Sequence, residues 1–332
     1  MIFLRPLLLV LSLLAAPLAA GASPDACQGR DLLRTLSPEA RAEIDRAAAT
    51  PFAEGNHWQA RRSGQVIDVV GTFHLYDARM DGPLERLKPL IAAADRIYLE
   101  ATDKEISELK QALGSRPEMI VLQGKTLPER LPADDWQKLS AAMAARGIPA
   151  FVAAKFQPWY VSMLLGVPAC AMTSLGGGSN GLDHLIGEAA KASGVPLAAL
   201  EPYDTVFTAL KELTDGDQVE MIRDALLTEP QSEDLMATMT DAYFSEDHRM
   251  IWEFGRYQAL HAPGADPAKV AAGLDRVEDL LIDRRNAAWA EILGRAPEKH
   301  LLVAVGAGHL GGEKGLLNLL QKQGFALTRQ EF

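Results

Sequence analysis

The sequence predicts an α/β fold with a central, mostly parallel sheet from two related βαβ-type halves and an all-helical insertion or cap. Three observations predict it. Short apolar runs of strand length alternate with segments of helical periodicity over most of the chain. One strand motif occurs twice, near opposite ends of the chain. The stretch from about 203 to 293 contains helix-period blocks and no convincing strand.

Six short apolar runs are the candidate strands: residues 66–70, 96–99, 150–153, 196–200, 301–305 and 325–328. Apolar residues at three-and-four spacing predict the helices between them: residues 82–94, 133–145, 182–192 and 312–323. Helices that alternate with strands are typical of βαβ crossovers, which join parallel strands. Because no low-complexity or proline-rich linker divides the chain, we expect residues 23–332 to form a single domain with a helical insertion at approximately 203–293.

Residues 1–22 have the pattern of a secretory signal peptide. Arg5 precedes a leucine-rich run, and small residues follow as far as Ala22. The apolar run is shorter than the ~20 residues that a membrane-spanning helix needs. We therefore expect cleavage before Ser23, no stable membrane anchor, and an exported protein that is periplasmic or secreted.

The charge balance argues against one class of partner. The 332 residues include 33 Lys+Arg and 44 Asp+Glu, which gives a formal net charge of −11. Nucleic-acid-binding proteins gain much of their affinity by neutralising phosphates with a basic face. We therefore expect no nucleic-acid partner, and a peptide or small molecule as the substrate.

Cys27 and Cys170 are the only cysteines in the sequence. Both remain after removal of the predicted signal peptide. In an exported protein a pair of cysteines is more often a structural disulfide than a reactive site. We expect a Cys27–Cys170 bridge that ties the N-terminus of the mature protein to its body.

The motif that occurs twice is an apolar run of five residues followed by Gly-x-x-His. Two segments align without gaps: VIDVVGTFH, which ends at His74, and LLVAVGAGH, which ends at His309. Gly71 and Gly306 let the backbone leave each strand with little steric restriction. Each histidine then lies beyond the carboxyl end of its strand, where open α/β sheets bind their ligands. If the two strands are near neighbours in the sheet, the two imidazoles converge.

A carboxylate is expected at the same edge of the sheet, because Glu100 directly follows the apolar run 96–99. Two histidines and a carboxylate suit a divalent transition metal such as Mn, Co, Zn or Fe. Such a metal lowers the pKa of a bound water and polarises a carbonyl, which is the chemistry of metal-assisted hydrolysis. A general base beside the metal is the alternative role for Glu100.

These segments resemble the TraB/PrgY/GumN family. The resemblance covers nearly all of the chain after the signal peptide and rests on GTFH, GAGH, the LE ending of the second strand, DRRNAAW, GLDHLIGEAAKASGVPLAALE and VAVGAGHLGGEKGLLNLLQKQGF. That family is related to the Tiki metalloproteases and more distantly to erythromycin-esterase-like and ChaN-like proteins. The resemblance implies an α/β fold of two related halves. It also implies a hydrolase-like site that in Tiki proteins depends on a divalent metal.

The resemblance assigns both Gly-x-x-His units and Glu100 to that site. It also implies that Arg285 and Asn286 match the family's Arg-Asn pair, with Arg285 stabilising an oxyanion or a substrate carboxylate and Asn286 donating a hydrogen bond. The alternative for the pair is a solvated ion-pair face of a helix. The chain departs from the family pattern after Glu201, which leaves the role of that residue open.

The sequence thus predicts a metal-dependent hydrolase acting on a peptide or amide bond, with His74 and His309 as metal ligands. The alternative is a non-catalytic haem or small-ligand binding protein of the same fold. Asp183 is expected to cap a helix. The four histidines without a matched context are expected at the surface: His57, His248, His261 and His300.

Overall fold

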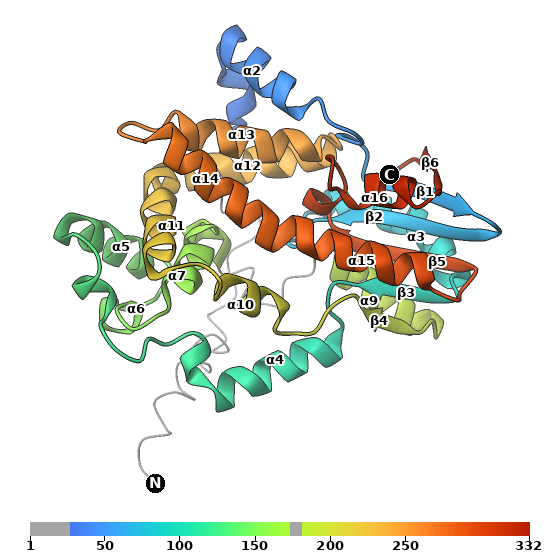
Figure 1. The fold of residues 1–332 in the computed structure, drawn as a ribbon, viewed down its shortest axis with the longest axis horizontal. Helices are drawn as coiled ribbons and strands as arrows, with labels where there is room; N and C mark the ends of the chain where they lie inside the picture. Colours follow the sequence, from blue (N-terminus) through green and yellow to red (C-terminus); the bar gives the residue numbers. More distant parts are fainter. Residues whose placement is uncertain (1–26, 173–180) are drawn as a thin grey trace.

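The computed structural model describes residues 27–172 and 181–332. The predicted signal peptide, residues 1–22, lies outside the described residues. One sheet of six strands forms the centre of one half of the molecule, and helices form the other half (Figure 1). Within the described ranges, no helix is both long and apolar enough to cross a membrane.

The strands are β1 (His57–Arg62), β2 (Gln65–Thr72), β3 (Arg96–Leu99), β4 (Leu197–Ala199), β5 (His300–Gly306) and β6 (Ala326–Arg329). Their order across the sheet is β4-β3-β5-β2-β1-β6. Strands β4, β3, β5 and β2 pair in parallel, whereas β1 is antiparallel to both of its neighbours. The predicted α/β fold with a mostly parallel sheet is therefore confirmed.

The register of the central strands brings the repeated motifs together. Strand β5 lies between β2 and β3 and is parallel to both, with Thr72 opposite Gly306 and Leu99 opposite Ala304. The two Gly-x-x-His units and Glu100 therefore leave the same edge of the sheet from three adjacent strands.

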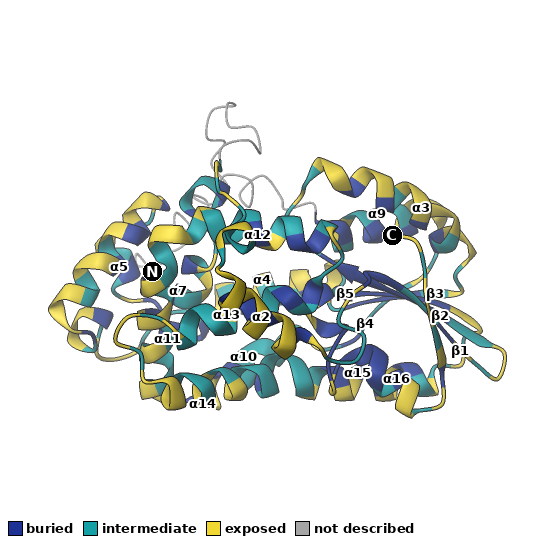
Figure 2. Ribbon diagram, turned by 90° about the horizontal axis from the view of Figure 1, so that it is seen from above, coloured by how far each residue is buried: buried dark blue, intermediate teal, exposed yellow. Residues whose placement is uncertain are grey.

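Helices cover both faces of the sheet, so its central strands are buried apolar runs (Figure 2). On one face α15 (Arg284–Arg295) and α16 (Leu316–Lys322) pack against Val69, Val303 and Val305. On the other face α3 (Asp81–Ala93) and α9 (Leu182–Ser193) pack against Val70 and Leu302. Alternate residues of each strand thus belong to different apolar clusters, as the two-residue period of a strand requires.

The remaining helices are α2 (Pro38–Ala48), α4 (Asp103–Ser115), α5 (Ala133–Ala145), α6 (Ala150–Ala153), α7 (Pro158–Leu165), α10 (Thr205–Leu210), α11 (Asp215–Thr228), α12 (Ser232–Phe244), α13 (His248–Leu260) and α14 (Pro267–Glu278). Every element from 205 to 295 is helical, in agreement with the expected run of helices. Helices α5, α6, α7 and α11 lie together away from the sheet around an apolar cluster of their own (Figure 1).

One predicted strand is wrong, and one strand was not predicted. Residues 150–153 form α6 rather than a strand, because the amides of Val152 and Ala153 donate back to the carbonyl of Pro149, as in a helical turn. Strand β1 is absent from the prediction because its sequence HWQARR shows no apolar pattern. It forms by hairpin pairing with β2 through Ser63 and Gly64, which both have positive φ.

Two histidines expected at the surface are buried. His57 lies in β1, where its Nε2 is 3.1 Å from Asp68 Oδ1 and its Nδ1 is 3.2 Å from the carbonyl of Glu331. His248 begins α13 and is 3% exposed. Burial lowers the pKa of His248 to about 4, and the charges of nearby arginines act in the same direction.

The Cys27–Cys170 disulfide is present, with its Cα atoms 5.4 Å apart, so that prediction is confirmed. The segment after Cys27 runs along α12. The amide of Arg30 donates to Asp234 Oδ1 at 2.7 Å, and the amide of Leu32 donates to Thr238 Oγ1 at 2.8 Å. The bridge therefore holds the N-terminal segment against the helical half of the molecule.

Candidate functional site

Three of the predicted site residues face one point at the carboxyl edge of the sheet. A β-carbon built on Gly306 would lie 3.3 Å from Oε1 of Glu100. It would lie 3.7 Å from Nε2 of His74 and 3.7 Å from Cδ2 of His309. The structure therefore brings together the two histidines and the carboxylate, and Gly306 leaves the space between them open.

Gly71 has a different role from the one expected. A β-carbon there would lie 2.7 Å from Leu310 Cδ1 and 3.1 Å from the Cα of Ala307. The glycine is thus required for close packing of the end of β2 against the turn η9 (Ala307–His309). On the other side, the hydroxyl of Tyr243 donates to the carbonyl of Gly71 at 3.0 Å.

Arg285 lies between two carboxylates. Its Nη2 donates to Glu100 Oε2 at 2.6 Å and to Glu201 Oε1 at 2.8 Å, and its Nε donates to Glu201 Oε2 at 2.9 Å. The side chain of Arg285 is 10% exposed. The alternative, a solvated ion-pair face, applies to the preceding residue: Arg284 pairs with Asp279 and Glu212 at the surface. Arg285 therefore belongs to the site and Arg284 to the surface.

His309 has both ring nitrogens engaged. The Asn286 amide nitrogen donates to the carbonyl of Lys314 at 3.0 Å, so its Oδ1 is the atom 2.8 Å from His309 Nδ1. Nδ1 must then carry the proton. The lone pair on Nε2 faces Nη1 of Arg285 at 3.2 Å. Asn286 thus fixes the tautomer of His309, rather than offering its own N–H to the centre of the site.

Burial lowers the pKa of His309 to about 4, and the positive charges of Arg285 and His74 act in the same direction. His74 is in the opposite situation. Its Nδ1 lies 3.3 Å from Asp183 Oδ1, and this hydrogen bond, together with the charges of Asp183 and Glu100, raises its pKa to about 9. At neutral pH the two imidazoles are therefore in different protonation states, with His309 neutral and His74 protonated.

Glu100 is held as a carboxylate. Its Oε1 accepts the amide N–H of Gly306 at 2.7 Å, and its Oε2 accepts from Arg285. Burial by itself would raise the pKa of this carboxyl. In the acid range where Glu100 titrates, His309 is protonated as well, and the positive charges of His309, Arg285 and His74 outweigh burial, so the pKa falls to about 2.

Three residues of the site are not among those predicted: Asp183, Glu201 and Trp289. Asp183 lies in the first turn of α9, but it pairs with His74 instead of capping the helix, where Gly181 is the N-cap. The indole Nε1 of Trp289 donates to Glu201 Oε2 at 3.1 Å. The Trp289 ring also lies 4.7 Å below the Arg285 guanidinium carbon and 4.5 Å from the His309 ring.

The donors as arranged do not fit a divalent metal. Within residues 27–172 and 181–332, no group of three or more His, Cys, Asp or Glu side chains is placed to hold a metal ion. Both oxygens of Glu100 and both ring nitrogens of His309 already have hydrogen-bond partners. The guanidinium of Arg285 contacts both residues, so the positive charge between them is already supplied by a side chain.

Comparisons with known proteins match the part of the chain that carries these residues. The model of the TraB/PrgY/gumN family matches residues 56–329, which include every site residue named above. The uncharacterized protein YbaP of Escherichia coli (strain K12) is 25% identical over 275 residues, covering 80% of this chain and 94% of that protein. YbaP of Shigella flexneri is 25% identical over 255 residues, covering 76% and 87%. The chain therefore belongs to the TraB/PrgY/gumN family.

Proposed function

We propose that this protein is a hydrolase that acts on a peptide or amide bond at the edge of the sheet near Gly306. The observation that carries the proposal is the convergence of His74, His309 and Glu100 on one point at Gly306, with His74 paired to a carboxylate and His309 to an amide. Groups whose surroundings push their pKa values apart are suited to separate acid and base roles. Here His74 is the proton donor, and Glu100 faces the same point as a carboxylate.

In the proposed reaction, a water held by Glu100 Oε1 attacks the carbonyl carbon of the substrate. The water gives one proton to Glu100, while Nε2–H of His74 gives a proton to the leaving nitrogen as the carbon–nitrogen bond breaks. Transfer of the proton from Glu100 to His74 then restores the site. The charge of Arg285 stabilises Glu100 and the negative charge that develops on the carbonyl oxygen.

The resemblance to the Tiki proteases implies a metal at this site, and such a metal requires Arg285 to move away from Glu100 and His309. Metal analysis of the purified protein tests that requirement. Metal that is retained by the wild type and lost in His74→Ala and His309→Ala supports the metal-dependent form of the proposal. The reaction described above uses no metal, so it predicts that peptide cleavage persists in the presence of EDTA.

Hydrolysis is tested with a pool of unfolded peptides and mass spectrometry of the products. We expect cleavage by the wild type and a fall of at least about 100-fold in kcat/KM for His74→Gln and Glu100→Gln. His261→Gln is the control, because His261 lies at the surface outside the site. Absence of cleavage with and without added Mn²⁺, Co²⁺ and Zn²⁺ contradicts the proposal. A Soret band on haem titration that disappears in His74→Ala supports the ligand-binding alternative instead.

We also propose that the protein is exported. A structural disulfide is typical of oxidising compartments, and the Cys27–Cys170 bridge begins only a few residues after the predicted cleavage position. N-terminal sequencing of protein from a periplasmic fraction should begin at Ser23. Recovery of the uncleaved chain from the cytoplasm contradicts this part of the proposal.

A further inference from the structure

Strand β4 is the edge of the sheet on the side nearest to Glu201. Within the part of the chain that the structure describes, it pairs with β3 alone. The amide of Ile97 donates to the carbonyl of Pro196 at 3.0 Å, and the amide of Leu200 donates to the carbonyl of Leu99 at 2.8 Å. Successive residues of a parallel strand alternate in the direction of their backbone groups. The N–H and C=O groups of Leu197 and Ala199 therefore point away from the sheet.

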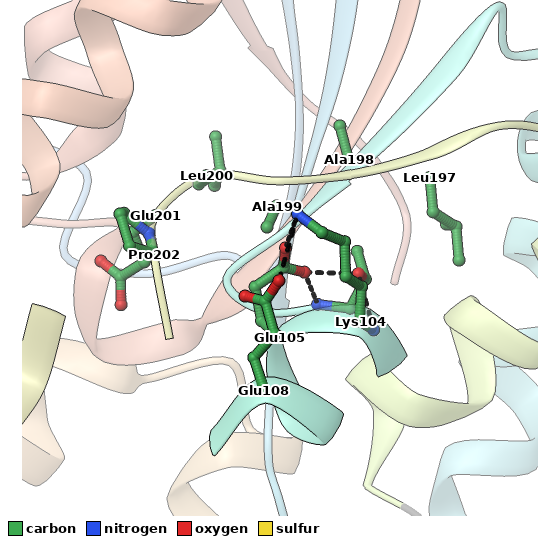
Figure 3. A pocket seen from close by; sticks show the side chains of 10 residues that line it. Lys104, Glu105, Glu108, Leu197, Ala198, Ala199, Leu200, Glu201 and Pro202 are labelled. Atoms are coloured by element: carbon green, nitrogen blue, oxygen red, sulfur yellow. Dashed lines mark hydrogen bonds and ion pairs between the residues drawn. The ribbon is translucent and has the colours of Figure 1, made fainter. Parts of the chain in front are cut away.

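A cavity of about 500 Å³ runs along this outer edge. One wall is the backbone of 197–202, and the other is the first two turns of α4 (Figure 3). Figure 3 shows Lys104, Glu105 and Glu108 of α4 across the cavity from the strand. Helix α4 therefore stands off from the edge of β4, and the groove between them is largely open to solvent.

One residue is shared by the wall of the cavity and the candidate site. Glu201 lines the cavity, and its carboxylate binds Arg285, which binds Glu100. Strand β4 runs parallel to β3, so its carboxyl end lies at the same edge of the sheet as Glu100. A chain placed alongside β4 is thereby directed toward the groups that are proposed to cleave it.

We propose that the peptide substrate binds in extended conformation as an added strand on the outer edge of β4, an inference that rests on the proposed function. The N–H and C=O groups of Leu197 and Ala199 form the ladder with the backbone of the substrate. An edge strand with unpaired backbone groups is a template for this kind of pairing. Recognition through the backbone makes the site one for unfolded segments of varied sequence rather than for one folded partner.

The test is binding of fluorescein-labelled β-casein, an unfolded polypeptide, to His74→Gln protein, in which the proposed proton donor is absent and the probe stays intact. Residue-resolved hydrogen–deuterium exchange is recorded with and without the probe. We expect the amides of Leu197 and Ala199 to exchange at least tenfold more slowly with the probe. The amides of Ala198 and Leu200, which face β3, should change less than twofold.

A substitution gives an independent readout. Ala199→Pro removes one outward N–H without removing a hydrogen bond to β3, and proline is tolerated at sheet edges. Ala199→Ser keeps the N–H and is the matched control. We expect about fivefold weaker binding of the probe for Ala199→Pro, and less than twofold weaker binding for Ala199→Ser.

Casein that does not bind, or that binds without slowing exchange at Leu197 and Ala199, overturns the added-strand model. The model is also overturned if, without casein, exchange at Leu197 and Ala199 slows as the protein concentration rises, because a second copy of the protein then occupies the edge of β4. If binding and protection occur but wild-type protein cleaves no peptide, the proposed function fails and the binding site stands. If cleavage occurs without protection at β4, the function stands and the inference fails.

Discussion

The two Gly-x-x-His units share a sequence pattern and a place at the sheet edge, but they differ in what surrounds the histidine. The first unit leaves β2 toward the start of α9, where His74 is 65% exposed along its side chain and pairs with Asp183. The second leaves β5 and turns beneath α15, where His309 is 5% exposed. Burial therefore acts mainly on the second imidazole and a carboxylate mainly on the first.

This difference shows that a duplicated motif specifies position but not protonation state. The neighbours supply the protonation state, and they come from helices that the two units do not share. Asp183 lies on α9, whereas Asn286 and Arg285 lie on α15. Substitution of a residue that contacts one histidine should therefore change the pKa of that histidine and leave the pKa of the other unchanged.

Arg285→Gln is expected to have the largest effect. It leaves Glu100 and Glu201 close together, part-buried and without their cation, and a broken buried ion pair typically destabilises a protein by about 3–5 kcal/mol. Urea unfolding monitored by circular dichroism measures this loss. Arg284→Gln is the control and should change stability by less than about 1 kcal/mol, because its ion pairs are at the surface. Equal effects of the two substitutions contradict the assignment of Arg285 to the site.

Acidification should destabilise the protein through the second unit. His309 has a pKa of about 4 in the folded protein against an ordinary value of 6.5. The unfolded chain therefore binds a proton that the folded chain does not, and stability is lost as the pH falls from 6.5 to 4. His248 contributes to the same loss for the same reason. Unfolding curves at several pH values should show a shallower decline for His309→Gln, and an unchanged decline contradicts the burial argument.

Asp183→Asn tests the first unit alone. Without the carboxylate, the pKa of His74 should fall from about 9 toward 6.5, since the hydrogen bond to Asp183 is the main cause of the raised value. A titration of the imidazole signals by NMR measures the shift, with the pKa of His309 as the internal control. If His74 is the proton donor, the alkaline limit of activity should move to lower pH with it. A shift of both histidines would show that the units are not independent.

Tyr243→Phe should have the smallest effect. It removes the hydroxyl that donates to the carbonyl of Gly71, and the loss of one such hydrogen bond costs about 1 kcal/mol. Thermal unfolding measures this loss of stability. The pKa of His309 should stay unchanged, because the hydroxyl donates to Gly71 and the ring stacks on Phe73, which both belong to the first unit. A larger change in the pKa of His309 than in that of His74 contradicts the assignment of Tyr243 to the first unit.

Most of the sheet could be predicted from the sequence because its inner strands are buried on both faces and read as apolar runs, interrupted in β2 by Asp68. The polar strand β1 could not, because hairpin pairing rather than apolar patterning fixes it. The repeat placed both histidines, and the end of the run 96–99 placed Glu100, at the carboxyl edge of the sheet; their convergence also required β2 and β5 to be neighbours, which the structure supplies. The position of Arg285 near the site was implied by the family resemblance.

Asp183 was not predicted as a partner of His74, because nothing in the sequence shows that the start of α9 returns to the end of β2. That return depends on Gly181, where a β-carbon would lie 2.4 Å from the carbonyl oxygen of Phe73. The amide of Leu182 donates to the same oxygen at 3.1 Å. Contacts of this kind join segments more than a hundred residues apart, and periodicity carries no information about them.

The wide helical turn η8 (Asp279–Asp283) joins α14 to α15 without a break in the long helix of Figure 1. A π-turn of this kind contains one residue more than an α-turn at the same place. Leu281, inside it, accepts the Nη1–H of Arg285 at 2.9 Å. Loss of one residue from this turn would rotate the two helices relative to each other by about 100° about their common axis. The number of residues in this one turn therefore decides which side chain of α15 faces Glu100. Deletion of a single residue there should disturb the site more severely than most substitutions.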